Sequence, residues 1–149
     1  MRRDEALAVA RQVAYSLLNT PYIWGGDDPM RGFDCSGFVI EILKSVGLLP
    51  QQGDWTAEGL YQLTKGFAVD VNSQVTEGCL LFWHTGDGKA AHVEYALNDT
   101  LSIGARGGGA ATSSLSVAIR QNAYTKIRPW EGRGRPILAV TWPFFALKQ

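Results

Sequence analysis

The fold is decided by the stretch Gly32-Phe33-Asp34-Cys35-Ser36-Gly37-Phe38-Val39-Ile40, where a glycine-punctuated loop gives way to an apolar run with helical spacing. Asp34 is a suitable helix N-cap, and it places Cys35 in the first helical turn. Backbone N–H groups and the positive end of the helix dipole favour a thiolate there. Cys35 is therefore a candidate nucleophile, and a buried structural cysteine is the alternative.

The composition is that of an ordinary globular protein, with 149 residues of which 46% are apolar and 19% are charged. We expect one domain over residues 1–149. Fourteen basic residues balance fourteen acidic ones, so no net field attracts nucleic acid or anionic lipid. The charged start is unlike a signal peptide, and no apolar run reaches the roughly 18 residues of a membrane span. We therefore expect synthesis in the cytoplasm without a signal peptide, no membrane insertion, and free thiols.

Hydrophobic spacing predicts helices first and strands afterwards. Helices are expected over 4–19, over 35–46, and from a cap at Asp54 or Thr56 through Leu63, with Trp55, Leu60 and Leu63 facing the core. Strands are expected over 67–71, 78–84, 90–97, 101–105, 124–128 and 137–142, with a hairpin turn at 85–89. Residues 21–32 are predicted to be irregular, and the glycine-rich segment 106–114 to be a mobile loop. This order is typical of the α+β class with an antiparallel sheet.

Two histidines can partner a catalytic thiol, and His92 is the better candidate. It lies early in an apolar strand, where neighbouring residues can hold the ring against the helix that carries Cys35. Strand alternation places Glu94 on the same face as His92. His84 lies beside the hairpin turn and is expected to be exposed. A Cys–His pair can attack a carbonyl with the thiol as nucleophile and the imidazole as general base.

A metal site is the first rival interpretation, because Cys35, Cys79, His84 and His92 are all zinc-type ligands. The sequence has neither a Cys-x-x-Cys motif nor a close histidine pair, and Cys79 and His84 should point to opposite strand faces. We expect no metal and no other cofactor, and Cys79 is interpreted as a core residue. The arginines near the end of the chain are interpreted as a solvated loop: Arg128, Arg133 and Arg135.

Four blocks together resemble the NlpC-type peptidoglycan endopeptidases, papain-like cysteine peptidases of the bacterial cell wall: Pro-Tyr-Ile-Trp-Gly-Gly at 21–26, Phe-Asp-Cys-Ser-Gly-Phe-Val at 33–39, Gly-Cys-Leu-Leu-Phe-Trp at 78–83 and Ala-His-Val at 91–93. They stand in family order and at family-like intervals. The resemblance implies a papain-like α+β fold, with N-terminal helices packed on an antiparallel sheet. It implies that Cys35, on the central helix, is the nucleophile and that His92 is the base. It also implies that Tyr22 lines the active site and that Asp34 and Ser36 help to bind a stem-peptide amino group.

One departure from the family concerns the residue that orients the base. The resemblance implies a polar third residue about twelve positions after His92, where this chain has Gly104. Because side chains alternate along a strand, Ser102 and Glu94 could take the place of this third residue. A backbone carbonyl or a water molecule could also orient the base. We favour a Cys–His dyad with no assigned orienter. Gly37 is expected to let the helix lie close to the sheet that holds His92.

The resemblance implies hydrolysis of an amide bond next to D-glutamate, with a peptidoglycan stem peptide or muropeptide as the partner. The strand from His92 and the glycine-rich segment after it resemble family members carried by bacteriophages more than housekeeping enzymes of the cell wall. That context implies phage tail proteins as partners and a place in the virion tail, and delivery to the wall by another route is the alternative. Two other interpretations stay open. One is an inactive tail or structural module of the same fold, and the other is an acyltransferase or amidase acting on another substrate.

Overall fold

The computed structural model describes residues 1–23, 26–28, 32–84, 86–106, 114–121, 123–133 and 136–149. Its helices are α1 (Arg3–Ser16), α2 (Cys35–Ser45), α3 (Ala57–Thr64) and α4 (Leu115–Gln121), with 3-10 turns at Lys65–Phe67 and Pro143–Ala146. Its strands are β1 (Asp27–Asp28), β2 (Gly32–Phe33), β3 (Ala68–Val69), β4 (Leu80–His84), β5 (Ala90–Ala96), β6 (Leu101–Ala105), β7 (Thr125–Pro129) and β8 (Ile137–Thr141). The helices α1, α2 and α3 all precede the strands of the large antiparallel sheet, so the α+β prediction is confirmed.

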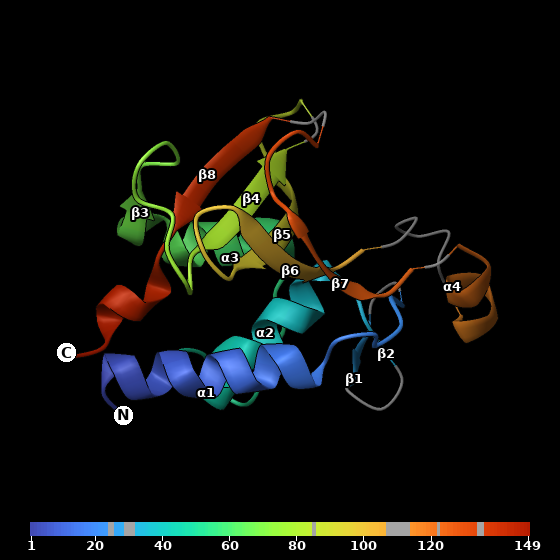
Figure 1. Ribbon diagram of the computed structural model, residues 1–149, viewed down its shortest axis with the longest axis horizontal. Coiled ribbons are helices and arrows are strands. Elements are labelled where there is room, and N and C mark those ends of the chain that lie inside the picture. Colours follow the sequence, from blue (N-terminus) through green and yellow to red (C-terminus); the bar gives the residue numbers. More distant parts are fainter. Residues whose placement is uncertain (24–25, 29–31, 85, 107–113, 122, 134–135) are drawn as a thin grey trace.

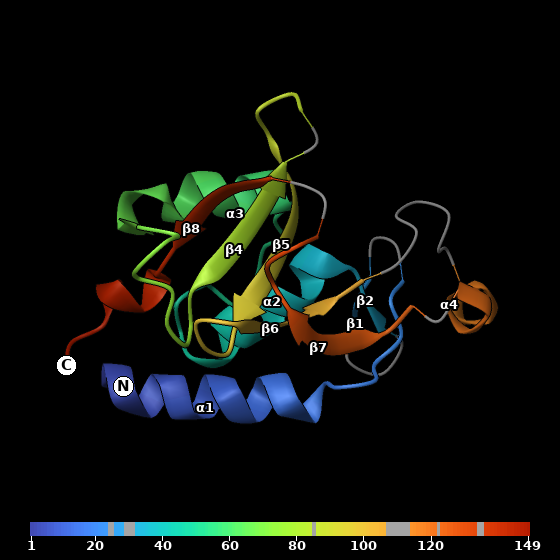
Figure 2. The ribbon, with the colours of Figure 1, turned by 45° about the horizontal axis from the view of Figure 1, so that its top comes forward.

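The described strands form a two-stranded sheet, β1-β2, and a six-stranded antiparallel sheet in the order β3-β8-β4-β5-β6-β7. In the large sheet, β5 lies between β4 and β6, and Trp83 of β4 is the partner of His92 on β5. Figures 1 and 2 show α2 between α1 and this sheet, with α4 standing apart at the far end. The central helix α2 meets the sheet at β5, the strand that carries the candidate base, and at the neighbouring β6.

The core forms on both faces of β4, because its residues alternate between two apolar clusters. Leu80 and Phe82 belong to the cluster that contains the buried apolar residues of α2. On the opposite face, Leu81 and Trp83 belong to the cluster that contains Trp130. The side of α1 that faces the core is made of small residues that are fully buried: Ala6, Ala10 and Ala14. This spacing of four keeps one narrow face of α1 toward the core.

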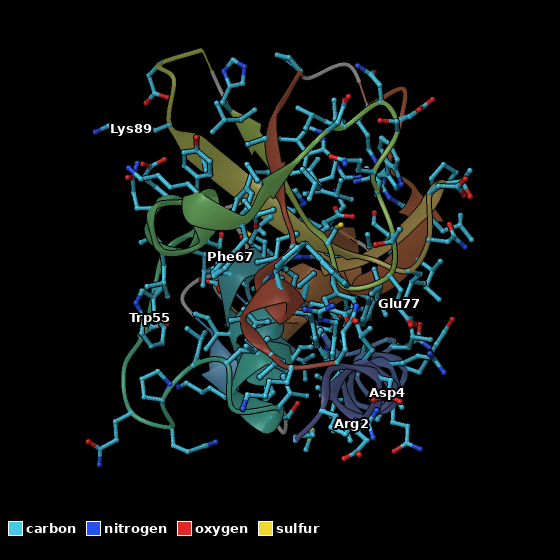
Figure 3. The ribbon with its side chains drawn as sticks, turned by 90° about the vertical axis from the view of Figure 1, so that its left-hand side faces the viewer. Arg2, Asp4, Trp55, Phe67, Glu77 and Lys89 are labelled. Atoms are coloured by element: carbon cyan, nitrogen blue, oxygen red, sulfur yellow. The ribbon has the colours of Figure 1, made fainter. Side chains whose placement is uncertain are left out.

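The chain ends lie close together, as Figure 1 shows, because Arg3 ties the start of α1 to the C-terminus. Its guanidinium donates to the carbonyls of Phe144 and Leu147 and lies over the ring of Trp142. Figure 3 looks onto this end of the molecule and shows Glu77 on the loop beside α1. Glu77 accepts two hydrogen bonds from Arg11 of α1, at 2.6 and 2.8 Å.

The three predicted helices and the five predicted strands from residue 78 onward are confirmed within a few residues. Thr56 is the cap of α3, accepting from the Gly59 N–H at 3.0 Å. The prediction that Leu63 faces the core is wrong, because this side chain is 52% exposed. The strand expected over 67–71 is reduced to β3, because residues up to Phe67 close a 3-10 turn.

The short strands β1 and β2, helix α4 and the two 3-10 turns were not predicted. The pair β1-β2 lies inside the stretch expected to be irregular, and α4 follows the glycine-rich segment. Most of that segment lies outside the described residues, so the prediction of a mobile loop there is not assessed. Among the helices that the structure describes, none combines the length and the apolar character needed to cross a membrane.

Candidate active site

The candidate nucleophile is the first residue of α2. Asp34 precedes it in an extended conformation, and its carboxylate accepts from the Gly37 N–H at 2.7 Å and from the Ser36 hydroxyl at 3.3 Å. This cap satisfies an N–H group that the helix itself leaves without a carbonyl partner. Cys35 is a free thiol and is partly exposed. The predicted N-cap is confirmed, and the sulfur is held at the positive end of a buried helix.

Gly37 lets a loop lie against the first turn of α2. A Cβ at this position would collide with the Gly26 carbonyl oxygen and would lie 2.9 Å from the Asp34 carboxylate. The same Gly26 carbonyl accepts from the Asp34 N–H at 3.0 Å. The expected reason for this glycine, close approach of the helix to the sheet, is therefore corrected, because the backbone that needs the room belongs to the preceding loop.

His92 lies on β5, where its ring interacts with the side chains of both Cys35 and Glu94. The bond between its Nε2 and Glu94 Oε2 is 2.6 Å long, and the ring packs against Trp83 with centroids 5.4 Å apart. Burial disfavours a charged ring, but the hydrogen bonds to Cys35 and Glu94 raise the pKa of His92 to about 9. The surroundings therefore favour an imidazolium beside the thiol.

Glu94 is 1% exposed, so its carboxyl group is buried within the protein. Burial alone would favour the protonated acid, but the hydrogen bonds from His92 and Arg133 outweigh it and hold the pKa of Glu94 well below its usual range. Arg133 donates at 2.7 and 3.2 Å, and Ser102 donates at 2.7 Å. Arg106 lies 4.0 Å away. The buried charge is thus paired and hydrogen-bonded, as a stable buried charge must be.

Arg133 is the member of this cluster that sequence reasoning missed. The prediction that it belongs to a solvated basic loop is wrong, because its side chain is 10% exposed and binds Glu94. Its guanidinium also donates to Ser102 at 3.2 Å and lies over the Trp83 ring. The only signal was a loop arginine close in sequence to a buried strand, which does not identify a partner 39 residues away.

Tyr22 lies at the same site and is 5% exposed. Burial raises the pKa of its hydroxyl, and the neighbouring Cys35 and Asp34 raise it further. Its backbone N–H donates to the Ala123 carbonyl at 2.8 Å, which fixes the loop before α2 to the segment before β7. The structure thus brings five of the predicted site residues together around Cys35: Tyr22, Asp34, Ser36, His92 and Glu94.

Two other candidates from the sequence lie away from Cys35. Cys79 is fully buried in the second apolar cluster, as predicted, and burial raises the pKa of its thiol. His84 ends β4, and its Nδ1 accepts from the Gly86 N–H at 3.2 Å. In the described part of the chain, no three of the side chains that commonly bind metals gather in one place.

The arrangement matches a known family. The model of the NlpC/P60 family fits residues 19–129. Murein DD-endopeptidase MepH of Escherichia coli K12 is 36% identical over 91 residues, which make up 60% of this chain and 32% of that protein. Protein P54 of Enterococcus faecium is 42% identical over 85 residues, or 56% of this chain and 15% of that protein. The chain thus spans less than a third of the length of these curated relatives.

Solved structures show the same fold over nearly the whole chain. The NlpC/p60 domain of the peptidoglycan hydrolase SagA is 30% identical, with a TM-score of 0.66 over 91% of this chain and 97% of that one. An NlpC/P60 family protein from Bacillus cereus has a TM-score of 0.72 at 22% identity, over 93% of this chain and 40% of that one. The papain-like fold expected from the sequence is therefore confirmed.

Proposed function

Because this chain belongs to the NlpC/P60 family, we propose that it hydrolyses amide bonds in peptidoglycan stem peptides with Cys35 as nucleophile and His92 as base. The observation that carries the proposal is that Cys35, at the start of a capped helix, interacts with a histidine whose Nε2 is bound to a buried carboxylate. Two relatives are a murein endopeptidase and a peptidoglycan hydrolase, and this supports the choice of substrate. The bacteriophage context and its tail partners stay predictions.

Proton positions follow from the partners of the imidazole. Glu94 is ionised and can only accept, so His92 Nε2 carries a proton toward it. That leaves Nδ1 as the ring nitrogen that serves Cys35. Transfer of the thiol proton to Nδ1 gives a thiolate and an imidazolium, and the raised pKa of His92 favours this ion pair.

In the acylation step, the Cys35 sulfur forms a bond to the carbonyl carbon, and the carbonyl π electrons move onto oxygen. Backbone N–H groups in the first turn of α2 are donors suited to that oxyanion. When the oxyanion collapses, the C–N bond breaks and the amine leaves with the proton from His92 Nδ1. The products of this step are a free amine and a thioester on Cys35.

In the deacylation step, His92 takes a proton from water as the water oxygen attacks the thioester carbonyl. The C–S bond breaks, the carboxylic acid product leaves, and the proton on His92 restores the ion pair with the Cys35 thiolate. We propose that Asp34 and Ser36, which flank Cys35 in the sequence and are hydrogen-bonded to each other, contact the substrate. Their carboxylate and hydroxyl suit the amino group of a stem peptide.

Digestion of defined muropeptides, followed by mass spectrometry, tests the proposal. We expect cleavage by the wild type and a loss on the order of 10³-fold or more in Cys35→Ala and His92→Ala. Cys79→Ala is the matched control, because it removes the other thiol, which lies in the core. Iodoacetamide should alkylate Cys35 and leave Cys79 unmodified in the folded protein. Full cleavage by Cys35→Ala, or no cleavage of any stem peptide by folded wild type, would contradict the proposal. The second result would favour the inactive structural module.

A further inference from the structure

We propose that Glu94 is the residue that positions His92, and that it does so from the strand of the base itself, in place of a side chain at position 104 on the neighbouring strand. The inference rests on the proposed function, since it assigns a role within the same site. Glu94 acts on the imidazole and not on substrate, so it is a positioning residue. Its partners Ser102 and Arg133 are the groups that hold it.

The register of the sheet explains why this exchange is possible. Tyr95 pairs with Ile103 and Ala96 with Ser102, so the ladder continues with Gly104 beside Glu94. A Cβ at position 104 would overlap Glu94 Cγ and would lie 2.8 Å from its Cδ. The Glu94 side chain therefore occupies the space that a side chain at 104 would need. The carboxylate of Glu94 on β5 thus takes the place of a polar side chain at position 104 on β6.

Glu94 is held as rigidly as a positioning role requires. Its Oε2 contacts His92 at 2.6 Å and Arg133 at 2.7 Å, and its Oε1 accepts from Ser102 at 2.7 Å. Arg133 is itself fixed, because its Nε donates to the Pro129 carbonyl at 2.8 Å. Arg–carboxylate pairs with two N–H donors have a defined geometry. The carboxylate is thus set in one orientation before any substrate binds.

Trp83 links the base to the arginine. The Trp83 ring packs against the His92 ring, and the Arg133 guanidinium lies 5.2 Å from the centroid of the Trp83 ring. The connection between β7 and β8, which supplies Arg133, therefore supports the base through both a charge and an aromatic contact. Arg106, which directly follows β6, lies 4.0 Å from the same Glu94 carboxylate. Without the carboxylate, His92 would keep Cys35 as a partner but would lose the anion that balances the nearby guanidinium groups of Arg133 and Arg106.

Titration of His92 by NMR tests the inference without any substrate. The chain has two histidines, so His84→Gln leaves a single imidazole signal. In that background, Glu94→Gln keeps the shape of the side chain and removes its charge, and we expect the His92 pKa to fall. Ser102→Ala is the control, because it removes one hydrogen bond to Glu94 and keeps the charge. An unchanged His92 titration in Glu94→Gln would overturn the inference.

Exchange variants test the position as well as the charge. Glu94→Ala should lower kcat on the order of 10²-fold with KM little changed. Gly104→Glu alone should also lower kcat, because the new side chain would overlap that of Glu94. The double variant Glu94→Ala/Gly104→Glu returns a carboxylate to the vacated space from β6, and it should recover at least about tenfold over Glu94→Ala. A double variant no more active than either single variant would count against the exchange.

The two experiments separate this inference from the proposed function. If the wild type cleaves no muropeptide while the His92 pKa still depends on Glu94, the proposed function fails and the positioning role stands. If the wild type cleaves muropeptides but substitution of Glu94 changes neither kcat nor the His92 titration, the positioning role fails and the proposed function stands. Urea unfolding of each variant shows whether a loss of kcat accompanies a folded chain.

Discussion

The nucleophile and the base are held in contrasting ways. Cys35 is positioned by residues next to it in sequence, since Asp34 caps the helix by reaching three residues forward to Gly37. The carboxylate behind His92 is positioned by residues far away, since Glu94 binds Ser102 and Arg133, 8 and 39 residues further on. The nucleophile end therefore depends on backbone geometry, and the base end depends on tertiary packing and charge. Substitutions at the two ends should fail in different ways.

Among variants that keep both Cys35 and His92, the largest effect is expected at the nucleophile end, in Gly37→Ala. The obstacle to a Cβ there is the Gly26 carbonyl, a backbone group that cannot rotate away. The loop and the first turn of α2 must separate, which we expect to cost about 1–3 kcal/mol of unfolding free energy. A displaced sulfur should also lower kcat on the order of 10²-fold. Urea unfolding and muropeptide kinetics measure the two losses.

Gly66→Ala is the matched control for Gly37→Ala. A Cβ at Gly66 would meet no atom within 4 Å. This variant should keep wild-type activity, and it should be neutral or slightly more stable because alanine restricts the unfolded chain. Wild-type kcat in Gly37→Ala would show that the loop does not fix the nucleophile, and the contrast between the two ends would lose its basis.

A smaller effect is expected at the base end, in the dependence of stability on pH. The raised pKa of His92 stabilises the fold fully below pH 6.5, and this contribution is lost as pH rises through about 9. The lowered pKa of Glu94 stabilises the fold above pH 4.5, and that contribution is lost as pH falls toward the folded value. Both contributions are present between pH 4.5 and 6.5. The unfolding free energy should fall by roughly 1–3 kcal/mol between the upper edge of this window and alkaline pH.

Urea unfolding at a series of pH values measures this window in the wild type and in Glu94→Gln. The variant should lose the acid slope, which belongs to Glu94 itself, and part of the alkaline slope, because Cys35 still raises the pKa of His92 when the Glu94 carboxylate is gone. A wild-type pH profile in the variant would show that Glu94 does not shift the titration of His92.

The same contrast explains what the sequence could predict. The cap, the helix and the cysteine on its first turn follow from neighbouring residues, so they were predicted together with the strand that carries His92. Strand parity also placed Glu94 on the face of His92, but nothing in the sequence showed that Gly104 opposite it leaves the needed space. Arg133 was misread for the same reason. Its partner is set by the path of the chain through β6, α4 and β7, which no local pattern encodes.

The smallest effect is expected from substitutions of Asp34, and it separates two roles of one carboxylate. Asp34→Ala removes the acceptor for the Gly37 N–H, which should cost about 0.5–2 kcal/mol of unfolding free energy. Asp34→Asn keeps an acceptor and should hold stability within about 0.5 kcal/mol of wild type, since Asn and Asp are equally good caps. If the carboxylate also binds the substrate amino group, Asp34→Asn should raise KM for muropeptides and leave kcat nearly unchanged. Equal KM values for Asp34→Asn and wild type would leave Asp34 with the cap alone, and the nucleophile end would then be specified entirely by backbone geometry.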